Sequence, residues 1–245
     1  HFWQAGLRQR HSRHARSARM SGASPRYQAV LLDLDGTMVD TIGDFVVAMN
    51  NTLQAVGSEA VPADVVRSWV GRGGPHLINE ARLYAGLPES DLASLRAGFY
   101  HHYGVINGQH SATFPGVDAG LALWRDRGVR LACVTNKPEA HARQLLALKG
   151  LDGYFGDFVW GGDTLAERKP HALPLQTACT ALGVPVTRSL MVGDSHTDAH
   201  AALAAGMDAA LLSWGYNHGL PIHGLPAVLH ADDFETLVQF WERTH

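Results

Sequence analysis

The sequence predicts an α/β fold, a doubly wound parallel sheet with a helical domain inserted after its first strand. Short apolar runs rich in β-branched residues alternate with helical patterns along the later part of the chain. These runs are continuously apolar rather than alternating, which is typical of strands that are covered on both faces, as in a parallel sheet. About 90 residues separate the first run from the second, and this interval has helical periodicity.

Length and composition indicate a globular protein. The 245 residues are 46% hydrophobic and 18% charged, which suffices for a large core and is too little charge for a disordered chain. No apolar run approaches the roughly 20 residues of a membrane span, and no secretory signal is evident. We therefore expect a cytoplasmic protein without a membrane partner. Cys133 and Cys179 lie in a predicted strand and a predicted helix, where packed thiols in a reducing compartment are expected.

Residues 1–27 differ in charge from the rest of the chain. They contain six arginines and no acidic residue, so the other residues carry −9 within a total net charge of −3. The segment has no strand or turn pattern, and Met20 precedes a plausible start at "MSGASPRYQAV". We interpret residues 1–27 as a disordered basic extension or a misplaced start. A transit peptide and a basic tail that binds nucleic acid are the alternatives. We expect no nucleic-acid partner.

The predicted strands lie at residues 29–35, 129–135, 157–163, 189–195 and 208–214. Helical patterns follow two of the later strands, as "PEAHARQLLALKG" and "HALPLQTACTALG". Each of these patterns ends on a glycine, which suits a helix C-terminus.

The long interval after the first strand is predicted to be a helical cap. Its first segment, "DFVVAMNNTLQAVG", has apolar residues on one stripe of a helix, at Phe45, Met49, Leu53 and Val56. Helical segments continue at "PADVVRSWV", "HLINEARLYAGL" and "LASLRAGFYHHY", and the chain returns to the sheet near "FPGV". We expect a core of residues 28–40 and 114–245 and a cap of residues 41–113.

Polar side chains cluster where the predicted strands end. The carboxyl ends of parallel strands line one crevice of an open sheet, so we expect these clusters to converge. Only three lysines occur against seventeen arginines, and two of the three lie in these clusters. The converging residues are Asp33 and Asp35 after the first strand, Thr135, Asn136 and Lys137 after the second, Lys169 before a helix, and Asp194 with Asp198 after the fourth.

This set of residues indicates phosphoryl transfer assisted by a metal ion. Two carboxylates about 4 Å apart repel by about 4 kcal/mol at an effective dielectric near 20, and all-oxygen ligands favour Mg²⁺ over zinc. A carboxylate beside Mg²⁺ and a lysine can attack phosphorus and become an acyl phosphate. The second carboxylate of "DLD" can protonate the leaving oxygen and then activate water. Gly36 would let the chain turn sharply beside the phosphate.

Four motifs in this order resemble those of the haloacid dehalogenase superfamily: "DLDGTMVD", "VTNKP", "RKP" and "GDSHTDAHAALAAG". The resemblance covers residues 28–245. Within the superfamily, "FPGV", "GGDTLAERKPHALPL", "SLMVGDS" and "WGYNHGLPI" are similar to bacterial phosphoglycolate phosphatases. The resemblance implies a Rossmann-like core with an inserted cap, and Mg²⁺-dependent hydrolysis of a small phosphorylated substrate, 2-phosphoglycolate, through an aspartyl-phosphate intermediate.

The resemblance also implies roles for individual residues. Asp33 would be the nucleophile and Asp35 the general acid and base. Thr135 and Lys169 would bind phosphate, and we add the neighbouring Asn136. The Mg²⁺ ligands would be Asp33, Asp194 and the main-chain carbonyl of Asp35, with Asp198 as a supporting acid.

Two departures from the family pattern affect these expectations. Thr197 stands where asparagine is common, which predicts weaker support of the metal site. Glu80 stands in the cap where an arginine is expected, so recognition of a substrate carboxylate is less clearly encoded than the phosphoryl chemistry. Arg72 in the glycine-rich "VGRGG" is the first candidate for this recognition, followed by Arg82 and then Arg67.

Other functions remain open from the residues alone. A related phosphatase on another small phosphate ester, a phosphomutase, a carbon–halogen hydrolase and a non-catalytic binding module are the alternatives. His196 and His200, at i and i+4, have a spacing able to hold zinc, but the preceding "GDS" favours a magnesium site. "VGRGGP" follows no strand, so a cap hinge or substrate loop is favoured over a nucleotide-binding loop. The oligomeric state is not predicted.

Overall fold

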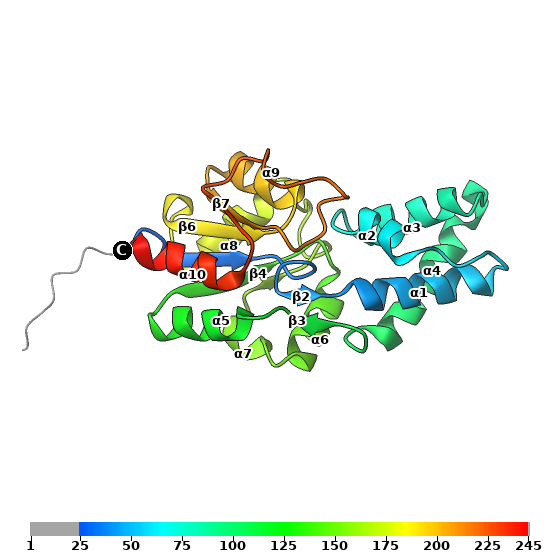
Figure 1. Ribbon diagram of the computed structural model, residues 1–245, viewed down its shortest axis with the longest axis horizontal. Helices are drawn as coiled ribbons and strands as arrows, with labels where there is room; N and C mark the ends of the chain where they lie inside the picture. Colours follow the sequence, from blue (N-terminus) through cyan, green and yellow to red (C-terminus); the bar gives the residue numbers. More distant parts are fainter. Residues whose placement is uncertain (1–24, 245) are drawn as a thin grey trace, which may run out of the picture.

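The computed structural model describes residues 25–244 and has two units, a core built on a sheet and a helical cap (Figure 1). The predicted basic extension, residues 1–27, lies outside the described residues except at its end. There Arg26 forms an ion pair with Asp208, and Tyr27 is fully buried in the core. The packed chain therefore includes two residues that the predicted boundary assigns to the extension.

The core contains a sheet of six parallel strands, so the predicted fold class is confirmed. The strand order is β5-β4-β1-β6-β7-β8, and β1 pairs with β4 on one side and β6 on the other. The last strand, β8, has no apolar run in the sequence and was not predicted. The strands are β1 (Ala29–Leu32), β4 (Arg130–Val134), β5 (Val159–Trp160), β6 (Ser189–Gly193), β7 (Asp208–Leu212) and β8 (Leu229–Ala231).

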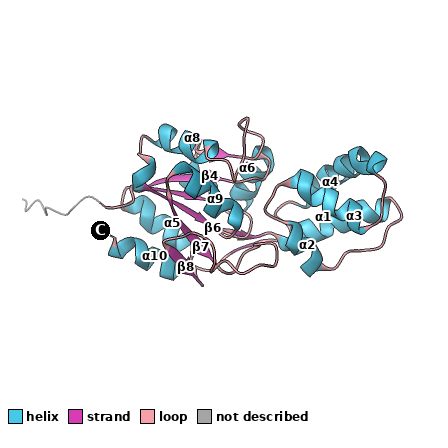
Figure 2. Cartoon of the chain, turned by 90° about the horizontal axis from the view of Figure 1, so that it is seen from above, coloured by secondary structure: helices cyan, strands magenta, loops and turns pink. Residues whose placement is uncertain are grey.

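Helices cover both faces of the sheet (Figure 2). Side chains along a strand alternate between faces: Val30 and Leu32 pack in one apolar cluster, and Ala29 and Leu31 in another. The first cluster includes residues of α5 (Val117–Asp126), α6 (Glu139–Leu148), α7 (Asp152–Phe155) and α10 (Phe234–Arg243). The second includes residues of α8 (Leu173–Leu182), which the turn η2 (Val186–Arg188) follows, and α9 (His196–Ala205). This double cover explains why the strands are continuously apolar.

The cap consists of four helices, whose apolar cluster also includes Tyr216 of the core. Phe45, Met49 and Leu53 are buried on one stripe, as predicted, but Val56 is 43% exposed. The reason is that the first helix ends at Ala55, so Val56 lies beyond the periodic stripe. The helices are α1 (Ile42–Ala55), α2 (Ala63–Trp69), α3 (Gly74–Tyr84) and α4 (Leu92–Ile106), with a short 3₁₀ turn, η1 (Glu89–Asp91), before the last.

A two-stranded antiparallel ribbon joins the cap to the core. Its strands are β2 (Val39–Asp40) and β3 (Ala112–Thr113), one in each of the two connecting segments. The chain thus leaves the core shortly after β1 and returns beside the point where it left. Figure 1 shows the cap beyond this ribbon, at the end of the core where β1 and β4 terminate. The exact residue limits of the two units stay a prediction.

Two expectations from composition concern the described residues as a whole. Cys133 and Cys179 are free and buried, and burial raises the pKa of both thiols. They are packed thiols, as predicted. Among residues 25–244, no helix has both the length and the apolar character needed to cross a membrane.

Candidate active site

Segments that follow three neighbouring strands bring the predicted site residues together. Asp33 and Asp35 follow β1, Thr135 follows β4, and Asp194 follows β6. Asp33, Thr135 and Asp194 are each less than a tenth exposed. Gly36 has a positive φ of 80°, and a Cβ there would lie 2.6 Å from Asp194 Oδ2. The sharp turn that the sequence predicts is therefore present, and it lets the backbone approach a carboxylate more closely than a side chain would allow.

Lys169 is the cation at the centre of these carboxylates. Its Nζ lies 3.1 Å from Asp33 Oδ1 and 2.6 Å from Asp198 Oδ1, and its side chain is fully buried. Burial alone would lower the pKa of Lys169, but the charges of Asp198 and Asp33 outweigh it and hold the pKa above its usual value. The ammonium is therefore charged and fixed between two carboxylates.

Asp33 and Asp194 carry more negative charge than the protein side chains balance. Burial raises the pKa of Asp33, the charge of Lys169 opposes the rise, and the charges of Asp198 and Asp35 add to it, which brings the pKa to about 7. Burial, together with the charges of Asp198 and Asp33, raises the pKa of Asp194 well above its usual range. The raised pKa values of these two buried carboxylates indicate that a further positive charge beside them, such as a bound cation, would be favourable.

The donor set fits a hard divalent cation such as Mg²⁺. Carboxylate oxygens of Asp33, Asp194 and Asp198 lie within 4.8 Å of one another. Asp198 is the most engaged of the three: Oδ1 accepts from Lys169, and Oδ2 accepts from the N–H groups of Asp194 and Ser195 and from Ser195 Oγ. Asp33 and Asp194 are therefore better able to bind a cation directly, and oxygen ligands favour Mg²⁺. The division into metal ligands, Asp33 and Asp194, and a supporting acid, Asp198, stays a prediction.

Thr37, Tyr216 and Asp198 orient the carboxylate pair. Thr37 Oγ1 donates to Asp194 Oδ1 at 2.7 Å, and the Tyr216 N–H donates to Asp194 Oδ2 at 2.6 Å. Asp198 lies in the first turn of α9, where its contacts with Ser195 cap the helix. Thr197, the departure from the family pattern, is buried, and its hydroxyl has no hydrogen-bond partner among the described residues. The fixed network thus leaves Thr197 outside.

Asp35 pairs with a second lysine to which the sequence assigned no role. Lys137 Nζ lies 2.7 Å from Asp35 Oδ1, and the side chain of Lys137 is 2% exposed. The ammonium also lies 4.8 Å from the ring centroids of both Phe45 and Tyr103 in the cap. The rarity of lysine and its place in "TNKP" were the only signals for Lys137 in the sequence, and they did not point to the cap.

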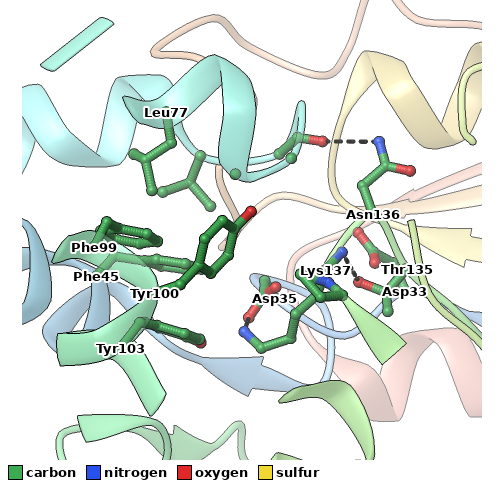
Figure 3. A pocket seen from close by; sticks show the side chains of 15 residues that line it. Asp33, Asp35, Phe45, Leu77, Phe99, Tyr100, Tyr103, Thr135, Asn136 and Lys137 are labelled. Carbon is green, nitrogen blue, oxygen red and sulfur yellow. Dashed lines mark hydrogen bonds and ion pairs between the residues drawn. The ribbon is translucent and has the colours of Figure 1, made fainter. Parts of the chain in front are cut away.

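A cavity between the cap and the core opens onto Asp33 and Asp35 (Figure 3). Its volume is about 40 Å³, and a single water molecule needs about 10–15 Å³ on this measure. The cap walls are mostly apolar or aromatic, and the glycine-rich segment before α3 lines one side. The lining residues are Asp33, Asp35, Phe45, Val70, Gly71, Gly73, Gly74, Leu77, Phe99, Tyr100, Tyr103, Thr135, Asn136, Lys137 and Pro138.

Asn136 lines the cavity but uses its amide group to join two segments. Its Nδ2 donates to the carbonyl of Lys169 at 2.8 Å and to the carbonyl of Gly71 at 3.4 Å. The side chain therefore ties the loop after β4 to the loop that carries Lys169 and to the glycine-rich segment of the cap. Phosphate binding by Asn136 stays a prediction.

The structure does not bring the cap arginines to the cavity. Arg72 is exposed and is not among the lining residues. Arg82 donates to Asn79 Oδ1 and to the carbonyl of Leu87 within the cap. Arg67 donates to two carbonyls of the core, as described below. A contact between Arg72 or Arg82 and a substrate therefore has no geometric support in this arrangement.

The histidine pair of α9 does not form a metal group. The rings of His196 and His200 are 5.9 Å apart, but the one group of three or more potential metal ligands in residues 25–244 is the aspartate cluster. Glu80, which replaces the expected arginine, lies 3.8 Å from His76 one turn earlier on α3. These residues contribute no charge to the cavity wall.

Comparisons with known proteins agree with this geometry. The chain is 46% identical over 205 residues to a phosphoglycolate phosphatase of Cupriavidus necator, covering 83% of this chain and 87% of that protein. It is 37% identical over 222 residues to a phosphoglycolate phosphatase of Pseudomonas fluorescens, covering 89% and 80%. A crystal structure from Haemophilus somnus, described as a predicted phosphoglycolate phosphatase, superposes with a TM-score of 0.85 at 30% identity, covering 89% and 99%.

The family comparison covers all four motifs. The sequence profile of the haloacid dehalogenase-like hydrolases matches residues 27–206, a span that includes β1, the cap, β4, Lys169 and the segment after β6. The resemblance drawn from the motifs is thus confirmed for the family, and the chain belongs to the haloacid dehalogenase-like hydrolases.

Proposed function

We propose that this chain is a Mg²⁺-dependent phosphomonoester hydrolase that converts 2-phosphoglycolate to glycolate and inorganic phosphate. The observation that carries the proposal is the position of the buried Asp33 carboxylate, which lies beside Lys169 and Asp194 and lines a small cavity under the cap. We infer the substrate from two relatives that are named phosphoglycolate phosphatases, which are 46% and 37% identical to this chain.

The reaction proceeds in two steps at Asp33. In the first, a carboxylate oxygen of Asp33 attacks phosphorus, the bond between phosphorus and the leaving oxygen breaks, and Asp35 gives that oxygen its proton. In the second, Asp35 takes a proton from water, the water oxygen attacks phosphorus, and the bond to Asp33 breaks. Glycolate leaves after the first step and inorganic phosphate after the second, and both carboxyl groups return to their starting states.

The other groups of the site offset charge and exclude water. Lys169 holds Asp33 in place and offsets negative charge at the phosphoryl group, and Thr135 supplies a hydroxyl donor. Mg²⁺, held by Asp33, Asp194 and the main-chain carbonyl of Asp35, would offset further negative charge of the phosphate when bound. The aromatic cap walls keep bulk water from the intermediate until the leaving group departs.

The size of the cavity is compatible with a small substrate. About 40 Å³ corresponds to a few water-sized groups, which suits a group as small as glycolate. A binding module without catalysis would have no use for Asp33, Asp35, Lys169 and Asp194 together, since their mutual repulsion and burial cost stability.

A screen of phosphate esters tests the proposal. The purified chain is incubated with Mg²⁺ and 2-phosphoglycolate, 3-phosphoglycerate, glucose 1-phosphate, glucose 6-phosphate or a nucleoside monophosphate, and release of inorganic phosphate is measured. We expect the highest kcat/KM for 2-phosphoglycolate, and loss of turnover by orders of magnitude in Asp33→Asn. A higher kcat/KM for a sugar phosphate, or turnover by Asp33→Asn that is confirmed to be free of deamidation, would overturn it.

A further inference from the structure

Lys137 is the one cationic side chain among the described residues that line the cavity. Lys169, the other lysine of the site, does not line the cavity, and its ammonium is paired with two carboxylates. Lys137 reaches from the loop after β4 toward the cap, and its ammonium lies between Asp35 and the rings of Phe45 and Tyr103 (Figure 3). A cation in the substrate cavity is expected to meet an anionic part of the substrate.

The protein contacts of Lys137 leave its hydrogen-bonding capacity incomplete. An ammonium group has three N–H donors, and among the described residues Nζ makes one hydrogen bond, to Asp35 Oδ1 at 2.7 Å. The two rings attract its charge at 4.8 Å from each centroid but accept no ordinary hydrogen bond. Two donors of a buried ammonium are therefore free for a second anion.

The chemistry of the proposed substrate puts an anion near this point. Asp35 must reach the oxygen that bridges phosphorus and the glycolate carbon, because it protonates that oxygen as it leaves. The carboxylate of phosphoglycolate is attached to that same carbon. A group in hydrogen-bond contact with Asp35 is therefore close to the substrate carboxylate, whereas Arg82 is held within the cap by Asn79 and Leu87.

We infer that Lys137 binds the carboxylate of the substrate and is the residue that selects phosphoglycolate over phosphate esters without a carboxylate. The inference rests on the proposed function and assigns the carboxylate to a core lysine instead of the cap arginines. The two aromatic rings stack at 5.2 Å between centroids, with 9° between their planes. They come from α1 and α4, so the cap fixes the position of the ammonium while the core supplies it.

The test compares two substrates that differ in the carboxylate. Initial rates are measured for 2-phosphoglycolate and for ethyl phosphate, with wild type and Lys137→Met, which removes the charge and keeps a long apolar side chain. Lys137 touches Asp35, so some loss is expected on both substrates. We expect kcat/KM for 2-phosphoglycolate to fall about 10- to 100-fold further than for ethyl phosphate, the range for a hydrogen bond to a charged group, with most of the difference in KM.

Lys149→Met is the matched control, because Lys149 is the one lysine outside the site. Its Nζ donates to the carbonyls of Gly108 and Ser111, so the ratio of the two kcat/KM values should stay at the wild-type value. Lys137→Gln serves as a second variant if Lys137→Met does not fold, since the amide can still donate to Asp35. We expect it to lose the preference for 2-phosphoglycolate in the same way.

The outcomes separate this inference from the proposed function. If wild type prefers 2-phosphoglycolate and the Lys137 variants lose equally on both substrates, the inference is overturned and the proposed function stands. A selective loss in Arg72→Ala without one in the Lys137 variants also overturns it, in favour of the cap arginine. If wild type shows no preference for 2-phosphoglycolate over ethyl phosphate, the proposed function fails and the inference fails with it.

Discussion

Asp33 makes folding stability depend on pH. Its pKa is about 7 in the folded protein, against about 4 in an unfolded chain. An acid whose pKa is raised by folding binds its proton more tightly in the folded state, so stability is lost as the pH rises from about 4 to about 7. The pair with Lys169 reduces this loss without removing it. A bound cation would reduce it further, which links metal binding to stability.

Asp33→Asn removes this dependence. The amide cannot ionise, so we expect the unfolding free energy of the variant, relative to wild type, to rise by about 4 kcal/mol between about pH 4 and about pH 8. The measurement is urea unfolding of both proteins in EDTA at several pH values. A relative stability that stays flat or falls over this range would contradict the assigned burial and charge of Asp33.

Substitutions of Asp194 and Asp198 should affect metal binding and folding stability to different extents. Asp194→Ala removes a carboxylate that is available to a cation, so the Mg²⁺ concentration for half-maximal activity should rise more than about tenfold. Asp198→Ala removes one carboxylate partner of the buried Lys169 and the acceptor of three hydrogen bonds at the start of α9. Compared with Asp194→Ala, it should lower the melting temperature more and the Mg²⁺ affinity less. Activity titrations with Mg²⁺ and thermal unfolding check the pair, and the reverse pattern would exchange their roles.

The residues of the phosphoryl site could be predicted from the sequence because each follows a strand or precedes a helix. Asp33, Asp194 and Lys169 meet once the strands are parallel, whatever the details of packing. Lys137 could not be assigned in this way, since its partners Phe45 and Tyr103 come from the cap and their distance depends on how the cap sits on the core. The same dependence explains why a glycine-rich loop suggested Arg72, although its side chain is exposed.

At the scale of elements, the apolar runs predicted five of the six strands and the periodic segments predicted the four cap helices. The strand β8 is three residues long, and one of them is a histidine, so it has no apolar signal of its own. It is held by pairing with β7. The expected strand at 157–163 is only Val159–Trp160, because the chain then turns toward Asn136 with two glycines, Gly161 and Gly162, packed against backbone.

The packing of α5 on α10 gives a matched pair of glycine substitutions. A Cβ at Gly120 of α5 would lie 2.5 Å from the ring of Phe234, so Gly120→Ala should destabilise the protein by about 1–3 kcal/mol through overpacking. Gly153 of α7 has no neighbour within 4 Å of such an atom, so Gly153→Ala should stabilise by about 0.5–1 kcal/mol through helix propensity. Urea unfolding measures both changes in the unfolding free energy, and a change of the same sign in both variants would show that α5 does not pack on α10 as described.

At the scale of the molecule, the apolar cluster of the cap includes one buried residue of the core, Tyr216, so the position of the cap depends on the contacts around Tyr216 as well as on the ribbon of β2 and β3. One such contact is made by Arg67 of α2. Its Nη2 donates to the carbonyls of Trp214 and Gly215 at 2.9 and 3.0 Å, and its guanidinium lies 4.9 Å from the centroid of the Tyr216 ring. These core residues follow β7, next to the carboxylate of Asp194.

Arg67→Ala should therefore weaken catalysis without changing substrate preference. The loss of two hydrogen bonds to the core loosens the cap and the loop that orients Asp194, so we expect kcat/KM to fall about tenfold on 2-phosphoglycolate and on ethyl phosphate alike. The ratio of the two values, measured beside that of Lys137→Met, is the decisive quantity. Because Nη2 is held by two main-chain carbonyls of the core and Arg67 does not line the cavity, we do not expect it to bind the substrate carboxylate. A loss confined to 2-phosphoglycolate would mean that Arg67 leaves these carbonyls to bind the substrate and that the cap, rather than Lys137, selects it.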